Sequence, residues 1–499
     1  MMRGNNRGGN RLFKCARACL EEKRVVWKLN GVKGFLGSKD YDSNERFINE
    51  LLCIDKSFDV VEKKLEFGGR KASYYFIDGF CKDEIMEKIM EFLYGLKEDD
   101  VPEDGEQFVR LCVPYGEAAV VYDKDSFIRD FMAGVPMLLV DGYDVMIGTD
   151  FRTYPARGVE EPEKDRVLRG ARDGFVETLV FNTALIRRRI RDINLVMDIH
   201  SVGKTSKTDV VVAYMKGRID EKLLDKVIER INQIEVDALS MNLENFLESF
   251  YPHKWYNPFP RFKTTERPDV TAASINEGNI IIMVDNSPAA IIVPTTLFDI
   301  IESADDYYFP VITGTYLRFS RLIINIVALL LTPTFLLLIN NPESIPSWLQ
   351  FIRIKEVVNV PVLLQLLLLE FAIDGMRLAA LNTPNMLSTP LSVIAGIVLG
   401  DFTVSSGWFN SEIMLYMAVV AIANYSQVNF ELGYALKFFR IITLVVTAAF
   451  GVYGYAGGLI LTCLCLVFNK TFAGKSYLYP LIPFDGKKLF ERLFRYVEK

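Results

Sequence analysis

The spacing of apolar and polar residues divides the chain into two parts of different character. Over roughly the first 300 residues, amphipathic segments with helical periodicity alternate with short apolar runs typical of strands. Helical periodicity is found at Phe47–Ile54, Lys82–Leu93, Phe175–Arg191 and Glu221–Ile234. Strands are indicated at Tyr74–Ile77, Ala118–Tyr122, Met137–Val140, Asp144–Gly148, Asp209–Tyr214, Asn279–Val284 and Ala289–Val293. This alternation predicts an α/β fold for the first part of the chain.

The α/β part is expected to contain two subdomains. A hairpin-turn signal, Asp141-Gly142, lies inside a strand cluster that ends at Gly148. Pro155 and Pro162 follow this cluster and favour an irregular connection. We therefore place subdomain 1 at residues 41–155 and subdomain 2 at residues 156–310, with no sheet continuing from one into the other.

Residues 1–40 are expected to be either disordered or bound to a membrane surface. The first ten residues are rich in glycine, asparagine and arginine, a composition that favours disorder. Apolar residues then recur at helical spacing among basic ones, from Leu12 to Leu20. This pattern fits a short helix on an anionic membrane surface, and it fits a solvated chain terminus equally well.

Long apolar runs dominate residues 311–470, and we expect them to form an all-α polytopic transmembrane bundle. The expected spans are Leu322–Ile339, Val360–Ala380, Met386–Val404, Ile413–Tyr425 and Phe438–Phe468. Glycines interrupt the last run, so it is either one long span or a helix–break–helix that re-enters. No export signal precedes the α/β part, and the tail of residues 471–499 is basic, so both are expected in the cytosol. That orientation requires an even number of crossings, so one apolar segment should be re-entrant or interfacial.

Composition and motifs exclude several classes of function. Hydrophobic residues make up 50% of the chain although 24% of residues are charged, and the formal net charge of −6 provides no general attraction to nucleic acid. With only His200 and His253 present, we expect neither a Cys/His metal site nor another cofactor. Gly203-Lys204-Thr205 resembles the end of a phosphate-binding loop, but Asp198 stands where that loop needs its first glycine. Since the chain also lacks the common hydrolase and dinucleotide-binding motifs, we expect no enzyme.

Three ionisable residues interrupt the second expected span. Glu370, Asp374 and Arg377 follow one another at intervals of four and three residues, which places them along one stripe of a helix, and Gln365 precedes them. Charges inside a membrane are costly and usually face a bundle interior or a water-filled path. We expect Arg377 to neutralise Asp374 and Glu370 to remain unpaired, lining an ion path that prefers cations. The alternative is a helix end with a self-neutralising Asp374–Arg377 pair.

Three blocks of the α/β part resemble the A subunits of spore germinant receptors, the GerA family. The first block contains Arg169, Gly170, Asp173, Gly174, Phe175, Glu177, Asn182, Arg187, Arg188 and Arg189. The second contains Tyr256-Asn257-Pro258-Phe259-Pro260 and Thr265, Glu266, Arg267, Pro268 and Asp269. The third contains Glu277-Gly278, Asp285, Ser287-Pro288, Pro294-Thr295-Thr296 and Asp305-Asp306-Tyr307-Tyr308. The resemblance covers roughly residues 45–490, with the blocks in the family's order.

This resemblance implies a role in spore germination, in the inner membrane of the endospore. It implies a ring-like homo-oligomer that releases ions, with the α/β domains forming the ring, the lipid bilayer around the helices and a small membrane protein as a partner. No nucleic acid partner is implied. The alternative function is a non-conducting signalling module whose cytosolic region senses a ligand or a partner.

The residues of the first two blocks also have a physical interpretation of their own. We expect one helix over residues 174–191, with Asp173 and Glu177 near its positive end and Arg187–Arg191 near its negative end. The basic end is either solvated or faces another chain's acidic surface or lipid headgroups. Pro268 should prevent a helix at Arg267, so Glu266 and Arg267 lie in a loop that either joins the two subdomains or is exposed.

Overall fold

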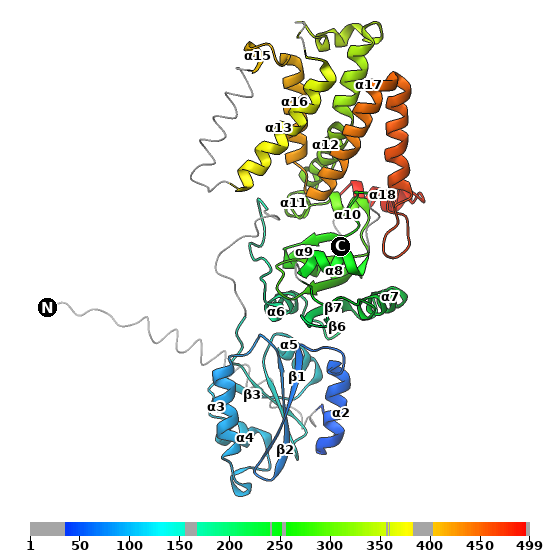
Figure 1. The fold of residues 1–499 in the computed structure, drawn as a ribbon. Helices are drawn as coiled ribbons and strands as arrows, with labels where there is room; N and C mark the ends of the chain where they lie inside the picture. The colour runs from blue at the N-terminus through cyan, green and yellow to red at the C-terminus, as the bar shows by residue number, and fades with distance from the viewer. Residues whose placement is uncertain are drawn as a thin grey trace, which may run out of the picture. The chain divides into compact units, whose positions relative to one another are not determined.

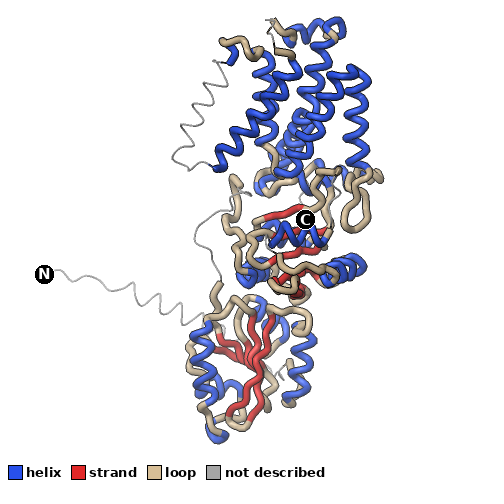
Figure 2. The backbone as a smooth tube through the Cα atoms, in the orientation of Figure 1, coloured by secondary structure: helices blue, strands red, loops and turns tan. Residues whose placement is uncertain are grey.

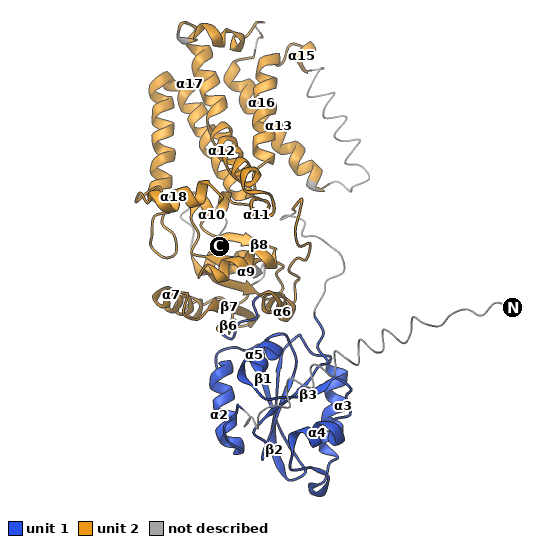
Figure 3. Cartoon of the chain, turned by 180° about the vertical axis from the view of Figure 1, so that it is seen from behind, with its two compact units in different colours: residues 1–155, 190–193 blue, residues 156–189, 194–499 orange. Residues whose placement is uncertain are grey.

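The computed structural model describes residues 35–154, 167–239, 242–251, 256–355, 358, 360–382 and 403–495 (Figure 1). The chain divides into two compact units. The first contains residues 1–155 and 190–193, and the second contains residues 156–189 and 194–499 (Figure 3). The expected N-terminal segment of residues 1–40 lies largely outside the described residues.

The first unit is built around a five-stranded antiparallel sheet with the order β1-β2-β4-β5-β3. Its strands are β1 (Val60–Phe67), β2 (Arg70–Ile77), β3 (Ala118–Val121), β4 (Met137–Val140) and β5 (Met146–Thr149). Its helices are α2 (Tyr41–Leu52), α3 (Asp83–Tyr94), α4 (Gly105–Cys112) and α5 (Lys124–Met132), with a short 3₁₀ turn at Glu98–Asp100. The predicted hairpin at Asp141-Gly142 joins β4 to β5. Buried aromatic residues such as Tyr74 and Phe108 fill the core between sheet and helices.

The second unit contains a separate antiparallel sheet with the order β6-β7-β9-β10-β8 (Figure 2). Its strands are β6 (Leu195–Val202), β7 (Thr208–Met215), β8 (Lys263–Thr265), β9 (Ile280–Val284) and β10 (Ala290–Val293). The accompanying helices are α6 (Leu179–Arg189), α7 (Glu221–Asn232), α8 (Asn242–Phe250), α9 (Pro268–Asn276), α10 (Leu297–Ile301) and α11 (Asp305–Tyr308). The two sheets share no strand, and apolar helices follow them, so the predicted fold class is confirmed.

Most of the described residues in the remainder of the second unit are helical. The helices are α12 (Val311–Asn340), α13 (Val362–Asn382), α15 (Thr403–Ser405), α16 (Ser411–Tyr425), α17 (Phe430–Val467) and α18 (Gly486–Leu493), with 3₁₀ turns at Pro342–Ser344 and Ser347–Ile352. Among the described residues, α12 and α17 are long and apolar enough to cross a membrane. The span expected at Met386–Val404 lies almost wholly outside the described residues. Pro333 is accommodated inside α12, as expected of a kink that neighbouring helices support.

Helix α17 folds back on itself at Gly451. This residue has φ 61° and ψ −133°, a conformation outside the helical region that only glycine adopts easily. Fifteen residues of a straight helix would separate Thr443 from Gly458 by about 22 Å. Instead, a Cβ atom at Gly458 would lie 2.9 Å from the Thr443 Cα, so the two halves pack closely against each other (Figures 1 and 2). Of the two expected forms of this run, the structure has the helix–break–helix.

Candidate functional site

The three motif blocks meet in the second unit through backbone hydrogen bonds. The Phe175 N–H donates to the Glu266 carbonyl over 2.8 Å, and the Asn286 N–H donates to the Glu177 carbonyl over 2.8 Å. Residues 170–178 are therefore held in an extended path between two distant loops, although Gly174 and Phe175 had been expected to begin a helix. The helix expected over residues 174–191 is shorter than predicted and begins only at Leu179.

Arg267 is the buried centre of this motif junction, with 1% of its surface exposed. Its guanidinium donates to Asp269 over 2.7 and 3.1 Å and to the Ala171 carbonyl over 2.9 Å. Burial alone raises the pKa of Asp269, but hydrogen bonds from Arg267 and Tyr308 outweigh it and hold that pKa below its ordinary value. As predicted, Arg267 is not helical and has an extended conformation; Pro268 then begins α9, a helix that the sequence analysis did not expect. Because Arg267 is buried and paired, the segment is not an exposed loop.

Gly170 brings the first and third blocks into direct contact. It has φ +123°, and a Cβ atom there would lie 2.4 Å from the ring of Tyr308, whose hydroxyl hydrogen-bonds Asp269. The neighbouring Arg169 is exposed. Contact between the two blocks thus depends on a position without a side chain.

We expect Gly170→Ala to destabilise the second unit by about 2–4 kcal/mol, because backbone strain at positive φ adds to a clash with the Tyr308 ring. Gly217→Ala is the matched control, since Gly217 has φ +83° but nothing within 4 Å of an added Cβ. Thermal unfolding of the purified variants measures the difference. Equal losses in melting temperature would mean that the Tyr308 contact contributes nothing.

The basic cluster at the end of α6 is not the surface that the sequence suggested. Arg187 is fully buried and donates to the Leu195 carbonyl over 3.0 Å. Arg189 donates to both carboxylate oxygens of Asp173 over 2.6 Å. Of the three arginines, Arg188 alone is exposed. The expectation that Arg187–Arg189 together face another chain or lipid is therefore wrong, because internal carbonyl and carboxylate groups use two of them.

The start of α6 is stabilised by amide and carboxylate side chains. Asn182 accepts from the Val176 N–H over 2.8 Å and donates to the Val176 carbonyl over 2.6 Å. The Leu179 N–H donates to Asp285 over 3.2 Å. Asp285 belongs to the third motif block. A side chain of that block therefore satisfies a backbone donor in the first turn of α6. Asp173 was expected at the helix start and instead pairs with the opposite end of the helix.

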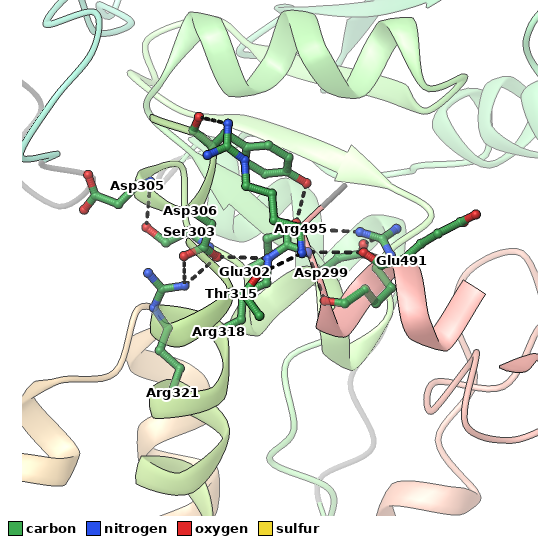
Figure 4. Close-up of polar contacts among 12 residues, drawn as sticks. Asp299, Glu302, Ser303, Asp305, Asp306, Thr315, Arg318, Arg321, Glu491 and Arg495 are labelled. Carbon is green, nitrogen blue, oxygen red and sulfur yellow. Dashed lines mark hydrogen bonds and ion pairs between the residues drawn. The ribbon is translucent and has the colours of Figure 1, made fainter. Parts of the chain in front are cut away.

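A second cluster of charges joins the α/β subdomain to the base of α12 (Figure 4). Asp306 is fully buried and accepts from Arg321 over 2.6 and 2.7 Å. Glu302 accepts from Arg318 over 2.6 Å. Both acids precede α12 in the chain and both arginines lie on α12, so we call this cluster the α12 junction.

The C-terminal segment completes the α12 junction. Arg492 in α18 donates to Glu302 over 3.0 Å and lies 2.8 Å from the Asp299 carboxylate. Burial alone raises the pKa of Glu302, but Lys263, Arg492 and Arg318 outweigh it and lower that pKa. The same acids, Asp299 and Glu302, raise the pKa of Arg492 against the opposing effect of burial. Glu302 and Arg492 therefore both remain charged inside the junction.

A buried ion network links α13 to α17 and contacts α12 in the apolar bundle. Glu370 in α13 is 3% exposed and accepts from Arg440 in α17 over 2.7 and 2.9 Å. Lys437 lies 3.3 Å from Glu370 and 2.5 Å from Asp374. Arg440 also donates to the Ala328 carbonyl in α12 over 2.5 Å. Two acids and two bases thus balance each other where three helices meet.

This network corrects the expected pairing of the intramembrane charges. Arg377 does not neutralise Asp374; its guanidinium lies over the rings of Phe430 and Tyr434, at 4.7 and 5.0 Å from their centroids. Glu370 is not unpaired, because Arg440 forms a bidentate ion pair with it. Gln365 is also buried, and it donates to Asn410 over 2.9 Å. Whether any of these residues lines an ion path stays a prediction.

The sequence carries a signal for Lys437 and Arg440. These two cations lie three residues apart in an apolar helix, and Glu370 and Asp374 lie four residues apart in another, so each pair shares one face of its helix. Complementary charge pairs on single faces of two apolar helices favour a pair between the helices. Local spacing within α13 favoured the wrong partner, Arg377.

Two cavities accompany these charged groups. A cavity of about 630 Å³ is lined by Asn257, Asp374, Glu431, Tyr434, Lys437 and Phe438, among others. A more polar cavity of about 280 Å³ lies against the α12 junction, between β8, Glu302, Arg321 and the connection from α16 to α17. Among the described residues, no group of three His, Cys, Asp or Glu side chains is arranged to hold a metal ion.

Comparison with known proteins assigns the chain to a family. A family model described as Bacillus/Clostridium GerA spore germination protein matches residues 48–498. Stage V sporulation protein AF of Bacillus subtilis (strain 168) is 34% identical over 91% of this chain and 92% of that protein. Spore germination protein KA of the same organism is 26% identical over 89% of this chain and 82% of its own length. A solved structure is also similar: the crystal structure of the N-terminal domain of the A subunit of the Bacillus megaterium spore germinant receptor GerK3. It has 23% sequence identity to this chain and a TM-score of 0.39, and the match spans 53% of this chain and 97% of the GerK3 domain.

The matched region includes the motif junction, the α12 junction and the ion network of the bundle. The resemblance inferred from the motif blocks is thereby confirmed. The chain belongs to the GerA family of spore germination proteins.

Proposed function

We propose that this protein is a multi-pass subunit of the inner membrane of the endospore that passes ions during germination. Several copies would assemble, and the α/β region on the cytosolic side would control the helices. Relatives of this chain are named for germination and sporulation, which supports the process but not the ion-conducting role. That role depends on the geometry of the helical bundle.

The observation that carries the proposal is the position of α12 between two charge clusters. At its base, Arg318 and Arg321 bind Glu302 and Asp306 of the α/β subdomain. Ala328 lies ten residues after Arg318 on the same helix. The Ala328 carbonyl accepts a hydrogen bond from Arg440, which also binds Glu370 of α13. A displacement of the α/β subdomain would therefore reach the intramembrane network through one continuous helix. Such a physical connection is what control of a membrane path by a cytosolic domain requires.

The chemistry of the network favours ion movement over a purely structural role. Ionised groups in apolar helices are costly, and proteins usually retain them at ion or proton paths. Asp374 is the most accessible acid of the network, with 35% of its side chain exposed, and it lines the cavity of about 630 Å³. In place of Glu370, we assign to Asp374 the expected preference for cations.

The ion pair between Arg492 and Glu302 supports the proposed orientation. It ties the basic C-terminal tail to the α/β subdomain, as expected if both lie on the cytosolic side. A small membrane-protein partner and a ring of identical subunits remain predictions from the family resemblance.

A non-conducting signalling module is the second candidate. One observation favours it: Glu370, Asp374, Lys437 and Arg440 all pair within the network, which is the arrangement expected of a structural connection between helices. In that case α12 would transmit a signal to a partner protein, and no ion would cross the bundle.

Ion flux from liposomes containing the purified full-length protein distinguishes the two candidates. Under the channel proposal, the protein releases trapped potassium, and Asp374→Asn lowers the preference for potassium over chloride by about threefold or more, since one carboxylate is removed from the path. Glu343→Gln is the matched control, because Glu343 is exposed and lies outside the network. Liposomes that stay tight while the protein is folded and correctly inserted would favour the signalling module.

A further inference from the structure

Helix α18 and the residues that flank it present aromatic side chains that the described part of the chain leaves uncovered. Phe484, Phe490 and Phe494 expose 74%, 56% and 38% of their surfaces. Leu481 and Ile482, just before the helix, are also more than 40% exposed. An exposed apolar cluster of this kind usually marks a surface that binds something.

The two faces of α18 carry different side chains. Arg492 points into the α12 junction, where it meets Asp299 and Glu302. Phe490 is two residues away, which places it about 160° around the helix from Arg492. Lys487 is three residues from Phe490 and therefore lies on nearly the same side, and it is exposed. The outward face of α18 thus combines aromatic residues with a flanking cation.

The position of α18 along α12 indicates what covers this face. The Phe494 ring packs against Phe319 of α12 at 5.4 Å between centroids, and the Arg495 N–H donates to Thr315 over 3.2 Å. The long apolar run of α12 begins at Leu322, about 4.5 Å further along the helix axis from Phe319. Exposed apolar residues of α12, Tyr316 and Ile323, continue across this level. Helix α18 therefore lies where the membrane-spanning part of α12 starts.

We propose that α18 is an interfacial helix that binds the surface of an anionic phospholipid bilayer. Phe484, Phe490 and Phe494 enter the boundary between headgroups and acyl chains, and Lys487 contacts lipid phosphates. A lipid surface fits better than a protein because the aromatic face is continuous with the exposed apolar surface of α12 and is flanked by Lys487. The proposal rests on the membrane location given under Proposed function and does not depend on ion conduction.

The same helix would connect the lipid surface to the α12 junction. One side of α18 holds Glu302 and Asp299 through Arg492, while the opposite side contacts lipid. Lipid binding would then stabilise the docked position of α18 and, with it, the attachment of the α/β subdomain to α12. Loss of lipid contact would weaken that attachment.

Fluorescence quenching in vesicles of brominated phosphatidylglycerol tests the proposal with the full-length protein. Phe490→Trp should add emission that falls at least twofold in brominated vesicles relative to unbrominated ones, measured against the unsubstituted protein with its own tryptophans. Adding Lys487→Glu to this variant should reduce that quenching by at least half, because the anionic surface then repels the outward face of the helix.

Two control variants separate this proposal from the membrane assignment. Ile326→Trp, in the apolar run of α12 and 56% exposed, should be quenched, whereas Leu111→Trp, in the first unit and 70% exposed, should not. Quenching at position 326 without quenching at position 490 overturns the interfacial helix and leaves the membrane assignment intact. Blue-shifted but unquenched emission at position 490 would mean that protein covers the helix, which also overturns it. An unquenched Ile326→Trp removes the membrane assignment and the inference together.

Discussion

Arg440→Leu should destabilise the helical bundle by about 3–5 kcal/mol, because it leaves the Glu370 carboxylate buried without its bidentate partner. Glu370 is 3% exposed, so water cannot replace the lost guanidinium. Lys437 remains nearby at 3.3 Å, but it also serves Asp374 and cannot satisfy both acids equally. Thermal unfolding in detergent, compared with the unsubstituted protein, measures the loss.

The double substitution Glu370→Leu with Arg440→Leu is the decisive companion. Replacing both members of a buried ion pair by apolar residues is often close to neutral, so the double variant should regain most of the lost stability. Arg377→Leu is the matched control for removal of a cation, and it should cost only about 0.5–2 kcal/mol because it loses contacts with aromatic rings. If Arg377→Leu proves more damaging than Arg440→Leu, the pairing described for the network is incorrect.

Arg187→Ala should unfold or strongly destabilise the second unit, at a cost of about 2–5 kcal/mol. The substitution opens a space in the core and removes the donor to the Leu195 carbonyl. Arg188→Ala provides an adjacent comparison, because Arg188 is exposed, and surface substitutions usually change stability by less than about 0.5 kcal/mol. Urea denaturation of the two variants gives both values under the same conditions.

This result would also separate two roles of the basic cluster. If the cluster served only to bind another chain, Arg187→Ala and Arg188→Ala would weaken assembly alike and leave the folding of each subunit unchanged. The structure instead predicts a folding defect specific to position 187. A folded, monomeric Arg187→Ala variant would contradict that prediction.

Most of the secondary structure could be predicted because it depends on local patterns. Strand β9 and helix α7 lie within two residues of their predicted ends, since apolar runs and helical periodicity report burial directly. Strands β1 and β6 were not predicted, because charged and polar residues interrupt their apolar pattern. In the structure, all eight residues of β1 pair with β2, and all eight residues of β6 pair with β7. Pairing with a neighbouring strand overrides a weak local preference.

The candidate site could be predicted only in part. The family motif identified Arg267 and Asp269, and the acids of α13 stood out because they interrupt an apolar run. It could not identify their partners. Arg267 binds the Ala171 carbonyl 96 positions away, and Glu370 binds Arg440 70 positions away. No local spacing rule relates residues at such separations.

By itself, the sequence determined the α/β part, the apolar helices and the membership of the family, whereas the break at Gly451 was one of two forms that it left open. Periodicity, turn residues and motif order carry this information, because each depends on neighbours close in the chain. Only the tertiary structure decided that Arg187 is buried, that Arg440 rather than Arg377 neutralises an acid of α13, and that α18 completes the α12 junction. A buried charge is stable only beside a group that satisfies it, and packing of distant segments determines which group that is.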